Sequence, residues 1–303
     1  MEKMRFDGKV VIVTGAGVGL GREYALEFAS RGASVIVNDL GAARDGSGAS
    51  KSAADTVVEE IQKQGGKAAA NYDDVSTPEG GKSIVQTAVD AFGTVDVLVN
   101  NAGILRDKSF MKMTVEEWDA IMSVHLRGAF CVTQPALAVM RQNNYGRIIV
   151  TSSTSGLFGN FGQSNYGAAK MGLVGLMNVL KLETSKYNVN INAIAPNAYS
   201  RMTEDLLPKE LAAKLHAKFN VPMVVYLCSE ESQENGSIFA MGAGWYAKTA
   251  IVCAPGACLG DGQRDVSAEE VRDHFDKITD LTGAKPLNNN MESFEFMAPL
   301  LKS

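Results

Sequence analysis

Three residues of types that can move a proton lie close together between positions 153 and 170. Tyr166 and Lys170 are four residues apart, and Ser153 lies thirteen residues before the tyrosine. Side chains at positions i and i+4 share one face of a helix. A lysine ammonium beside a phenol stabilises the phenolate, so we expect Lys170 to lower the pKa of Tyr166 from its ordinary value of about 10. Tyr166 is then a candidate general acid/base, and the Ser153 hydroxyl is a candidate partner of the same reacting oxygen.

The elements around these residues decide whether the spacing has chemical meaning. An apolar run at residues 147–150 predicts a strand that ends in small hydroxyl residues, and a loop with three glycines follows. A helix is then expected from about Ser164 to about Tyr187. A tyrosine and a lysine four apart also occur on ordinary helix surfaces. The ordered set of strand-end serine, glycine loop and helical Tyr–Lys pair is much more specific for catalysis.

Composition excludes several other classes of protein. The chain has 303 residues, a net charge of −5 and an apolar fraction of 46%. Nucleic acids and anionic membranes attract basic surfaces, so neither is an expected partner. No run of 18 apolar residues predicts a membrane span, and the start of the sequence lacks the layout of a signal peptide. The four cysteines and three histidines have no metal-ligand spacing, so we expect reduced thiols and no metal site.

A glycine-rich turn near the start predicts a dinucleotide cradle. The buried strand at residues 9–14 leads into Gly15-Ala16-Gly17-Val18-Gly19-Leu20-Gly21 and an amphipathic helix at residues 22–31. Glycines let the backbone approach a pyrophosphate closely, and a helix N-terminus offers free N–H groups. The next strand ends in Asp39, 18 positions beyond Gly21, close to the spacing at which a carboxylate binds the adenosine ribose. Alternatively, the turn is only a tight connection and Asp39 only ends a strand.

The remaining chain alternates strands and helices, which predicts an α/β fold with a doubly wound parallel sheet. Further strands are expected at residues 67–72, 95–99, 189–195 and 237–241, and long helices at 52–64, 78–92 and 114–141. We expect a dinucleotide-binding and catalytic domain at residues 1–244 and a C-terminal extension at 245–303. Residues 41–50 form a long Gly/Ala/Ser-rich loop that either folds over the adenosine end of a cofactor or extends into solvent.

The motifs together resemble the short-chain dehydrogenases/reductases. They are T-G-x3-G-x-G at Thr14–Gly21, Asn100-Asn101-Ala102-Gly103 after the fourth strand, and the Ser153, Tyr166 and Lys170 set. The resemblance implies a seven-stranded Rossmann sheet and NAD-dependent oxidation of a secondary alcohol by these three catalytic residues. It also implies cofactor contacts from Gly15, Val18, Gly19, Leu20, Gly21, Asp39, Asp74, Val75, Asn101, Ala102, Gly103, Tyr166, Lys170, Pro196, Ala198 and Ser200.

The acidic residue and its surroundings favour NAD over NADP. A carboxylate at Asp39 repels a 2′-phosphate. Relatives that prefer NADP often carry a basic residue just before Gly19 or just after Asp39, where this chain has Val18 and Leu40.

Two positions depart from the wider family. His125 stands where the family has an asparagine whose backbone carbonyl positions a water that relays protons from the lysine. A backbone carbonyl survives substitution, so His125 is either a packed, hydrogen-bonded histidine or a catalytic residue. Asn197 replaces a glycine after Pro196, so the hydroxyl that contacts the nicotinamide carboxamide is either Ser200 or Thr203.

Longer matches narrow the resemblance to (3R)-hydroxyacyl-CoA dehydrogenase units of peroxisomal multifunctional enzymes. They include Val124-His125-Leu126-Arg127-Gly128, Gly159-Asn160-Phe161-Gly162-Gln163 and Ala195-Pro196-Asn197-Ala198. The implied substrate is an acyl-CoA thioester, with a steroid 17-hydroxyl as the first alternative. Reduction of 3-oxoacyl carrier-protein substrates and a non-catalytic NAD-binding role are further alternatives. The resemblance implies a homodimer whose extension contributes dimer contacts and the substrate entrance, in the cytoplasm of a bacterium or, for an excised eukaryotic unit, in the peroxisome.

Overall fold

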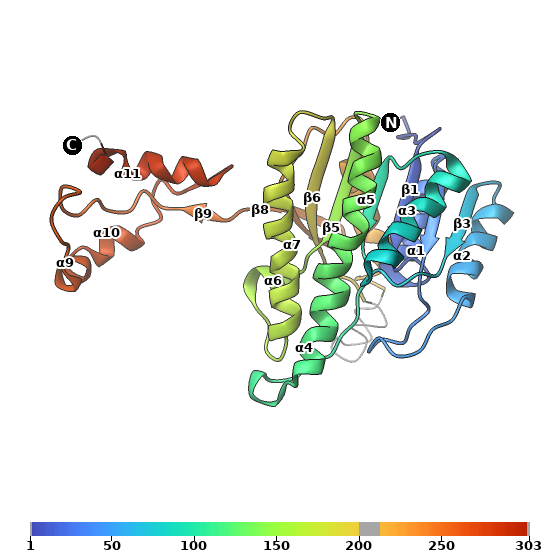
Figure 1. Ribbon diagram of the computed structural model, residues 1–303, viewed down its shortest axis with the longest axis horizontal. Coiled ribbons are helices and arrows are strands. Elements are labelled where there is room, and N and C mark those ends of the chain that lie inside the picture. The colour runs from blue at the N-terminus through green and yellow to red at the C-terminus, as the bar shows by residue number, and fades with distance from the viewer. Residues whose placement is uncertain (1, 200–212, 302–303) are drawn as a thin grey trace. The chain divides into compact units, whose positions relative to one another are not determined.

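The computed structural model describes residues 2–199 and 213–301 (Figure 1). The chain divides into two compact units, residues 1–248 and 249–303. The first unit contains the described parts of all the predicted site motifs. Ser200 and Thr203, between which the sequence left the nicotinamide contact open, lie outside the described residues.

A twisted sheet forms the centre of the first unit. Its strands, in the described residues, are β1 (Val10–Thr14), β2 (Ser34–Asn38), β3 (Lys67–Asn71), β4 (Val97–Asn100), β5 (Gly146–Thr151), β6 (Val189–Pro196), β7 (Ile238–Gly242) and β8 (Trp245–Thr249). The spatial order is β3-β2-β1-β4-β5-β6-β7-β8, and neighbouring strands from β3 to β7 are parallel. Buried Val and Ile fill β1, β2 and β5 because both faces of a parallel sheet are covered. The predicted α/β doubly wound fold is confirmed.

The eighth strand was not expected from the sequence. Ala243 and Gly244 connect β7 to β8, and both have positive φ angles, 52° and 85°. Such angles are typical of two-residue hairpins, so β8 continues the sheet beyond the seven strands that the resemblance implied.

Helices cover both faces of the sheet. They are α1 (Gly19–Ser30), α2 (Ser52–Lys63), α3 (Pro78–Phe92), α4 (Val115–Ile121), η2 (Met122–Arg127), α5 (Gly128–Gln142), α6 (Thr154–Phe158), α7 (Ser164–Glu183) and α8 (Val221–Cys228). One apolar core lies against α1, α2 and α8, and a second lies against α3, α5 and α7, which Figure 1 shows in front of the sheet. None of the helices within 2–199 and 213–301 is long and apolar enough to cross a membrane.

Local sequence signals explain where several helices begin and end. Thr77 caps α3 by accepting a hydrogen bond from Gly80 N, Pro78 occupies the first turn, and Gly93 ends the helix with φ 86°. Thr114 and Glu117 form a capping box at α4. The helix α7, which carries Tyr166 and Lys170, begins at Ser164 as predicted and ends at Glu183.

The second unit consists of short elements. They are β9 (Val252–Cys253), α9 (Ala268–Asp273), α10 (Phe275–Thr279), β10 (Lys285–Pro286), η5 (Asn290–Ser293) and α11 (Phe294–Leu301). α9 and α10 meet at His274. β9 and β10 pair antiparallel.

Candidate active site

The candidate site lies at the carboxyl ends of β1 and β4, where the strand order reverses. Ligands of open parallel sheets bind in such crevices. The two strand ends are tied together here, because Asn101 Nδ2 donates hydrogen bonds to the carbonyl oxygens of Thr14 and Gly15 at 3.0 and 3.1 Å. Thr14 Oγ1 in turn accepts from the backbone N–H groups of Asn101 and Ala102. The Asn-Asn-Ala-Gly segment thus fixes the floor of the crevice.

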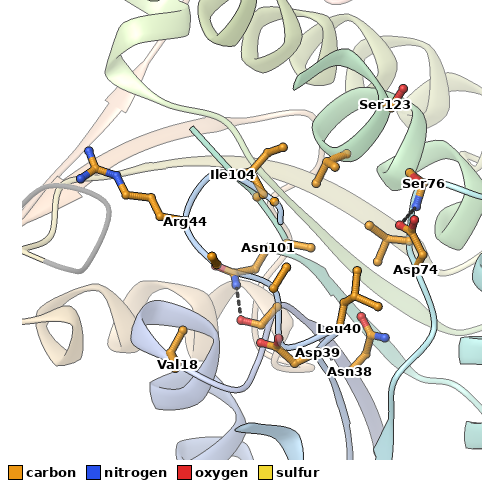
Figure 2. A pocket seen from close by; sticks show the side chains of 18 of the residues that line it. Val18, Asn38, Asp39, Leu40, Arg44, Asp74, Ser76, Asn101, Ile104 and Ser123 are labelled. Carbon is orange, nitrogen blue, oxygen red and sulfur yellow. Dashed lines mark hydrogen bonds between the residues drawn. The ribbon is translucent and has the colours of Figure 1, made fainter. Parts of the chain in front are cut away.

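A cleft of about 360 Å³ opens at this point. Its size lies within the range of ligand pockets in proteins. Ten of the predicted cofactor residues line it: Gly15, Val18, Gly19, Leu20, Asp39, Asp74, Val75, Asn101, Ala102 and Gly103. In Figure 2, Val18, Asp39 and Leu40 lie at one edge of the cleft, and Ile104 and Ser123 lie at the opposite edge.

The glycine turn fits a dinucleotide because its backbone leaves no room for side chains below the cleft. A Cβ on Gly15 would lie 2.8 Å from the Ala102 Cα, and one on Gly21 would lie 2.2 Å from the Gly15 carbonyl oxygen. Gly19 has nothing within 4 Å of such a position and has a φ of 58°, which favours glycine. Because α1 already begins at Gly19, three residues earlier than expected, its N-terminus reaches the cleft.

The loop at residues 41–50 borders the cleft and so does not simply extend into solvent, while its place over the adenosine end of a cofactor stays a prediction. Ala42, Ala43, Arg44 and Gly46 line the cavity. Leu105 N donates a hydrogen bond to the Arg44 carbonyl at 3.0 Å. Arg106 Nε donates to the Asp45 carbonyl at 2.9 Å, so the loop is tied to the chain that follows β4.

Asp74 and Val75 follow β3 at another side of the cleft. The Asp74 Oδ1 accepts a hydrogen bond from Ser76 N at 2.9 Å, which holds the turn (Figure 2). Val75 is buried at 8% exposure and packs in the core under α5. Both residues are placed where a ligand in the cleft would meet them.

The three catalytic candidates meet beside the cleft, outside its lining. Ser153 caps α6 at the end of β5, and its hydroxyl hydrogen-bonds the phenol of Tyr166. Lys170, one turn further along α7, is 3% exposed and has its Nζ 5.4 Å from the centre of the Tyr166 ring. The spacing that predicted one shared helix face is therefore realised.

The expected effect of Lys170 on Tyr166 is not observed. Burial raises the pKa of Tyr166 to about 12, while the hydrogen bond from Ser153 lowers it. Burial also lowers the pKa of Lys170 to about 7. Lys170 Nζ donates a hydrogen bond to the Thr151 carbonyl at 2.5 Å. Loss of hydration, and not the charge of the lysine, dominates the pKa of the phenol.

His125 connects the two parts of the site. Its Nε2 lies 2.8 Å from the carbonyl oxygen of Ile104, a residue that lines the cleft. Its ring packs edge-on against Tyr166 with centroids 5.1 Å apart. The alternative of a packed, hydrogen-bonded histidine thus describes its contacts.

Several predicted cofactor residues lie outside the cleft lining. Gly21 is buried in α1 against Gly15, and its absent side chain allows the helix to pack on the turn. Pro196 ends β6, and Ala198 follows at 8% exposure. Ser200 is not described.

Sequence reasoning also missed residues that line the cleft. They are Asn38, Leu40, Ala42, Ala43, Arg44, Gly46, Asp73, Ser76, Ile104, Arg106, Ala120, Ser123 and Val124. For the four of these residues in the loop at residues 41–50, the unusual length of the loop was the one sequence signal of a role at the cleft. In the portion of the chain that the structure describes, no group of three or more His, Cys, Asp or Glu side chains is placed to hold a metal ion.

Comparisons with known proteins agree with this arrangement. A family model described as short chain dehydrogenase matches residues 9–210. The chain is 53% identical over 290 residues to peroxisomal multifunctional enzyme type 2 of Mus musculus, covering 96% of this chain and 39% of that protein. It is also 53% identical over 277 residues to a putative short-chain type dehydrogenase/reductase of Mycobacterium tuberculosis, covering 91% of this chain and 96% of that protein.

A solved structure shows the same fold over nearly the whole chain. Full-length peroxisomal multifunctional enzyme type 2 from Drosophila melanogaster matches with a TM-score of 0.83 and 43% identity, over 99% of this chain and 50% of that one. The chain therefore spans about a third to three fifths of the length of the multifunctional proteins that it matches, and almost all of the mycobacterial relative.

Proposed function

The chain belongs to the short-chain dehydrogenase family, and from that premise we propose that it oxidises (3R)-hydroxyacyl-CoA thioesters to 3-oxoacyl-CoA with NAD. It is an NAD(P)-dependent oxidoreductase that acts on CH–OH groups. The proposal adds the choice of cofactor, the three catalytic residues and the substrate class. The observation that carries it is the meeting of Ser153, Tyr166 and Lys170 beside a cleft that contains Asp39.

Asp39 supports NAD as the cofactor. It follows β2 and lines the cleft, flanked by the apolar Leu40 and faced by Val18. A carboxylate accepts hydrogen bonds from the two ribose hydroxyls and repels a phosphate in place of one of them. NAD supplies the hydride acceptor when bound. The cleft, its glycine turn and the N-terminus of α1 orient it.

The catalytic roles follow from the hydrogen bonds and the pKa directions. Tyr166 receives the proton of the substrate hydroxyl, and Ser153, whose hydroxyl hydrogen-bonds the phenol, lies close enough to donate to the same substrate oxygen. With a pKa of about 12, Tyr166 is protonated at neutral pH and needs a base to become a phenolate. Burial lowers the pKa of Lys170 to about 7, and its amine lies beside the Tyr166 ring, so it is the proposed acceptor of that proton.

The acyl-CoA substrate class is proposed from relatives. Two proteins named peroxisomal multifunctional enzyme type 2, from mouse and Drosophila, are 53% and 52% identical to this chain over the shared region. His125 and Asn197, which depart from the wider family, fit the same group. The unit at residues 249–303 exposes Leu281, Met291 and Leu301, in accord with a role at an interface or substrate entrance.

The experiment is NADH or NADPH formation by the purified chain. (3R)-3-hydroxyacyl-CoA, its (3S) enantiomer and estradiol are each offered with NAD and with NADP. Turnover of the (3R) thioester with NAD at least about tenfold above all other pairs supports the proposal. Preference for estradiol would move the substrate to steroids. Full activity of Tyr166→Phe would contradict the catalytic assignment.

A further inference from the structure

His125 occupies an irregular turn of helix. The segment between α4 and α5, η2 (Met122–Arg127), is π-helical. Single π-turns inside α-helices are rare and frequently mark functional sites, because the wider turn redirects one side chain. His125 lies within this turn and is 3% exposed.

Three contacts fix the imidazole ring. Nε2 lies 2.8 Å from the Ile104 carbonyl oxygen and 3.1 Å from the Ile104 backbone nitrogen. The ring meets Tyr166 at an interplanar angle of 84°. A Cβ on Gly103 would lie 2.4 Å from the imidazole Cε1, so a glycine at 103 is what admits the ring. The ring therefore cannot turn without displacing the cleft segment or the catalytic tyrosine.

The other ring nitrogen has no partner among the described residues. His125 Nδ1 is buried and makes no hydrogen bond there. Buried polar atoms are hydrogen-bonded as a rule, and an unsatisfied one costs about 1–3 kcal/mol. Burial, together with the charge of Lys170, lowers the pKa of His125 well below its ordinary value, so the ring is neutral. Both the Ile104 carbonyl oxygen, at 2.8 Å, and the Ile104 N–H, at 3.1 Å, face Nε2. The shorter contact favours the tautomer in which Nε2–H donates to the carbonyl, and Nδ1 is then an acceptor.

A second, small cavity adjoins both His125 and Lys170. His125 and Lys170 both line it, together with Thr14 and Asn100, and its volume is about 10 Å³. That is about the space one water molecule needs, and the site offers the polar partners a buried water requires.

We propose that His125 is a positioning residue whose Nδ1 accepts a hydrogen bond from a water in this cavity, and that this water bridges the imidazole to Nζ of Lys170. The inference rests on the proposed function. Lys170 already donates to the Thr151 carbonyl at 2.5 Å, and the bridge fixes a second direction for its amine. The ring stays neutral, with its one proton on Nε2, and does not relay the proton of the reaction. Its side chain, and not only a backbone carbonyl, thereby sets the geometry of the Tyr166–Lys170 pair.

Two substitutions separate this role from simple packing. In His125→Asn, an amide oxygen can take the place of Nδ1, and the contact to Ile104 is lost. In His125→Gln, the longer amide can reach Ile104 as Nε2 does, and no atom replaces Nδ1. If the proposal holds, the His125→Asn variant keeps the pH midpoint of kcat within about 0.3 units of the original chain. The His125→Gln variant shifts this midpoint by more than about 0.5 units and lowers kcat about tenfold or more. In both variants the KM for the dinucleotide stays within about threefold.

If the role of His125 were purely structural, His125→Asn would be the more damaging variant, since only the Gln side chain would keep the Ile104 contact. That ranking, or equal effects of both variants, overturns the proposal. Met140→Ala, in the core at the far end of α5, controls for lost stability and is expected to leave the pH midpoint unchanged. Thermal unfolding of each variant verifies folding.

Nitrogen-15 NMR of histidine-labelled protein gives a readout that does not depend on turnover. The signal absent from the spectrum of His125→Asn identifies His125 among three histidines. An unprotonated, hydrogen-bonded Nδ1 supports the bridge, whereas a protonated or unbonded Nδ1 overturns it. If the protein oxidises no alcohol but its spectrum still shows a hydrogen-bonded Nδ1, the proposed function is wrong and the water site stands.

Discussion

The Asp39 carboxylate accepts a hydrogen bond from the backbone N–H of Gly17, with Oδ2 2.7 Å from the amide nitrogen. Its Oδ1 accepts another from Gly41 N, also at 2.7 Å. One carboxylate therefore holds both the glycine turn and the start of the loop at residues 41–50. Each oxygen keeps a second lone pair for a ribose hydroxyl. Asp39 thus shapes the cleft before any ligand arrives.

Asp39→Ala removes both hydrogen bonds and the negative charge. We expect the Kd of NAD to rise about 10- to 100-fold, equivalent to about 1.4–2.8 kcal/mol, and that of NADP to rise much less because a repulsion is removed at the same time. Fluorescence titration with NADH and NADPH measures both. Asp45→Ala is the control, because it removes the same charge from the neighbouring loop. Its preference for NAD over NADP should match that of the original chain. Unchanged preference in Asp39→Ala would remove the basis for choosing NAD.

Ser153→Ala tests the hydrogen bond that lowers the pKa of Tyr166. Without it the pKa of the phenol rises further, and because the deprotonated phenol is the active form, the ascending limb of the kcat/KM profile should move to higher pH. The rate should also fall about 10²- to 10³-fold, the usual cost of losing one donor at a reacting oxygen. Ser155→Ala, two residues later in the same turn, is the control. A slower enzyme with an unmoved pH profile would mean that Ser153 only orients the substrate.

Arg106→Ala tests whether the loop at residues 41–50 retains the cofactor. Losing the hydrogen bond to the Asp45 carbonyl costs about 1 kcal/mol, which corresponds to about fivefold faster release of NADH in stopped-flow measurements. Lys108→Ala removes an equal charge from the same segment, and its release rate should not change. Equal acceleration in both variants would assign the effect to charge and leave the loop as a passive border.

The cluster of Ser153, Tyr166 and Lys170 and the glycine turn could be predicted because their signals are local. The spacing of Tyr166 and Lys170 fixes one helix face, and the alternation of strands and helices fixes a parallel sheet whose carboxyl ends carry Gly15 and Asn101. These relations need no knowledge of distant contacts.

The features that could not be predicted depend on contacts between residues far apart in the sequence, for which no local pattern exists. The π-turn at His125 is a change of hydrogen-bond register within a continuous helical pattern, so hydrophobic periodicity does not reveal it. The tie between Arg106 and Asp45 joins residues 61 apart. The pKa of Tyr166 was expected to fall because a lysine is near, but burial outweighs that charge.

The lowered pKa of Lys170 also predicts how the stability of the fold depends on pH. Its pKa is lowered from 10.5 to about 7 in the folded protein because the buried ammonium has lost its hydration. Between about pH 7 and pH 10.5 the unfolded chain therefore binds more protons at this residue than the folded chain. Stability contributed by this site rises with pH across that window, and the cost of the lysine is greatest at or below about pH 7.

Lys170→Met removes this cost and the hydrogen bond to the Thr151 carbonyl, while abolishing activity. We expect a net gain in the free energy of unfolding on the order of 1–3 kcal/mol at about pH 7, since a lost hydrogen bond offsets only part of it. Urea unfolding at about pH 7 and about pH 9.5 should show the gain shrinking at the higher pH. Lys186→Met, at an exposed lysine beyond α7, should show no such dependence. A loss of stability at both pH values would mean that the buried amine is stabilised in the fold by contacts stronger than its hydration.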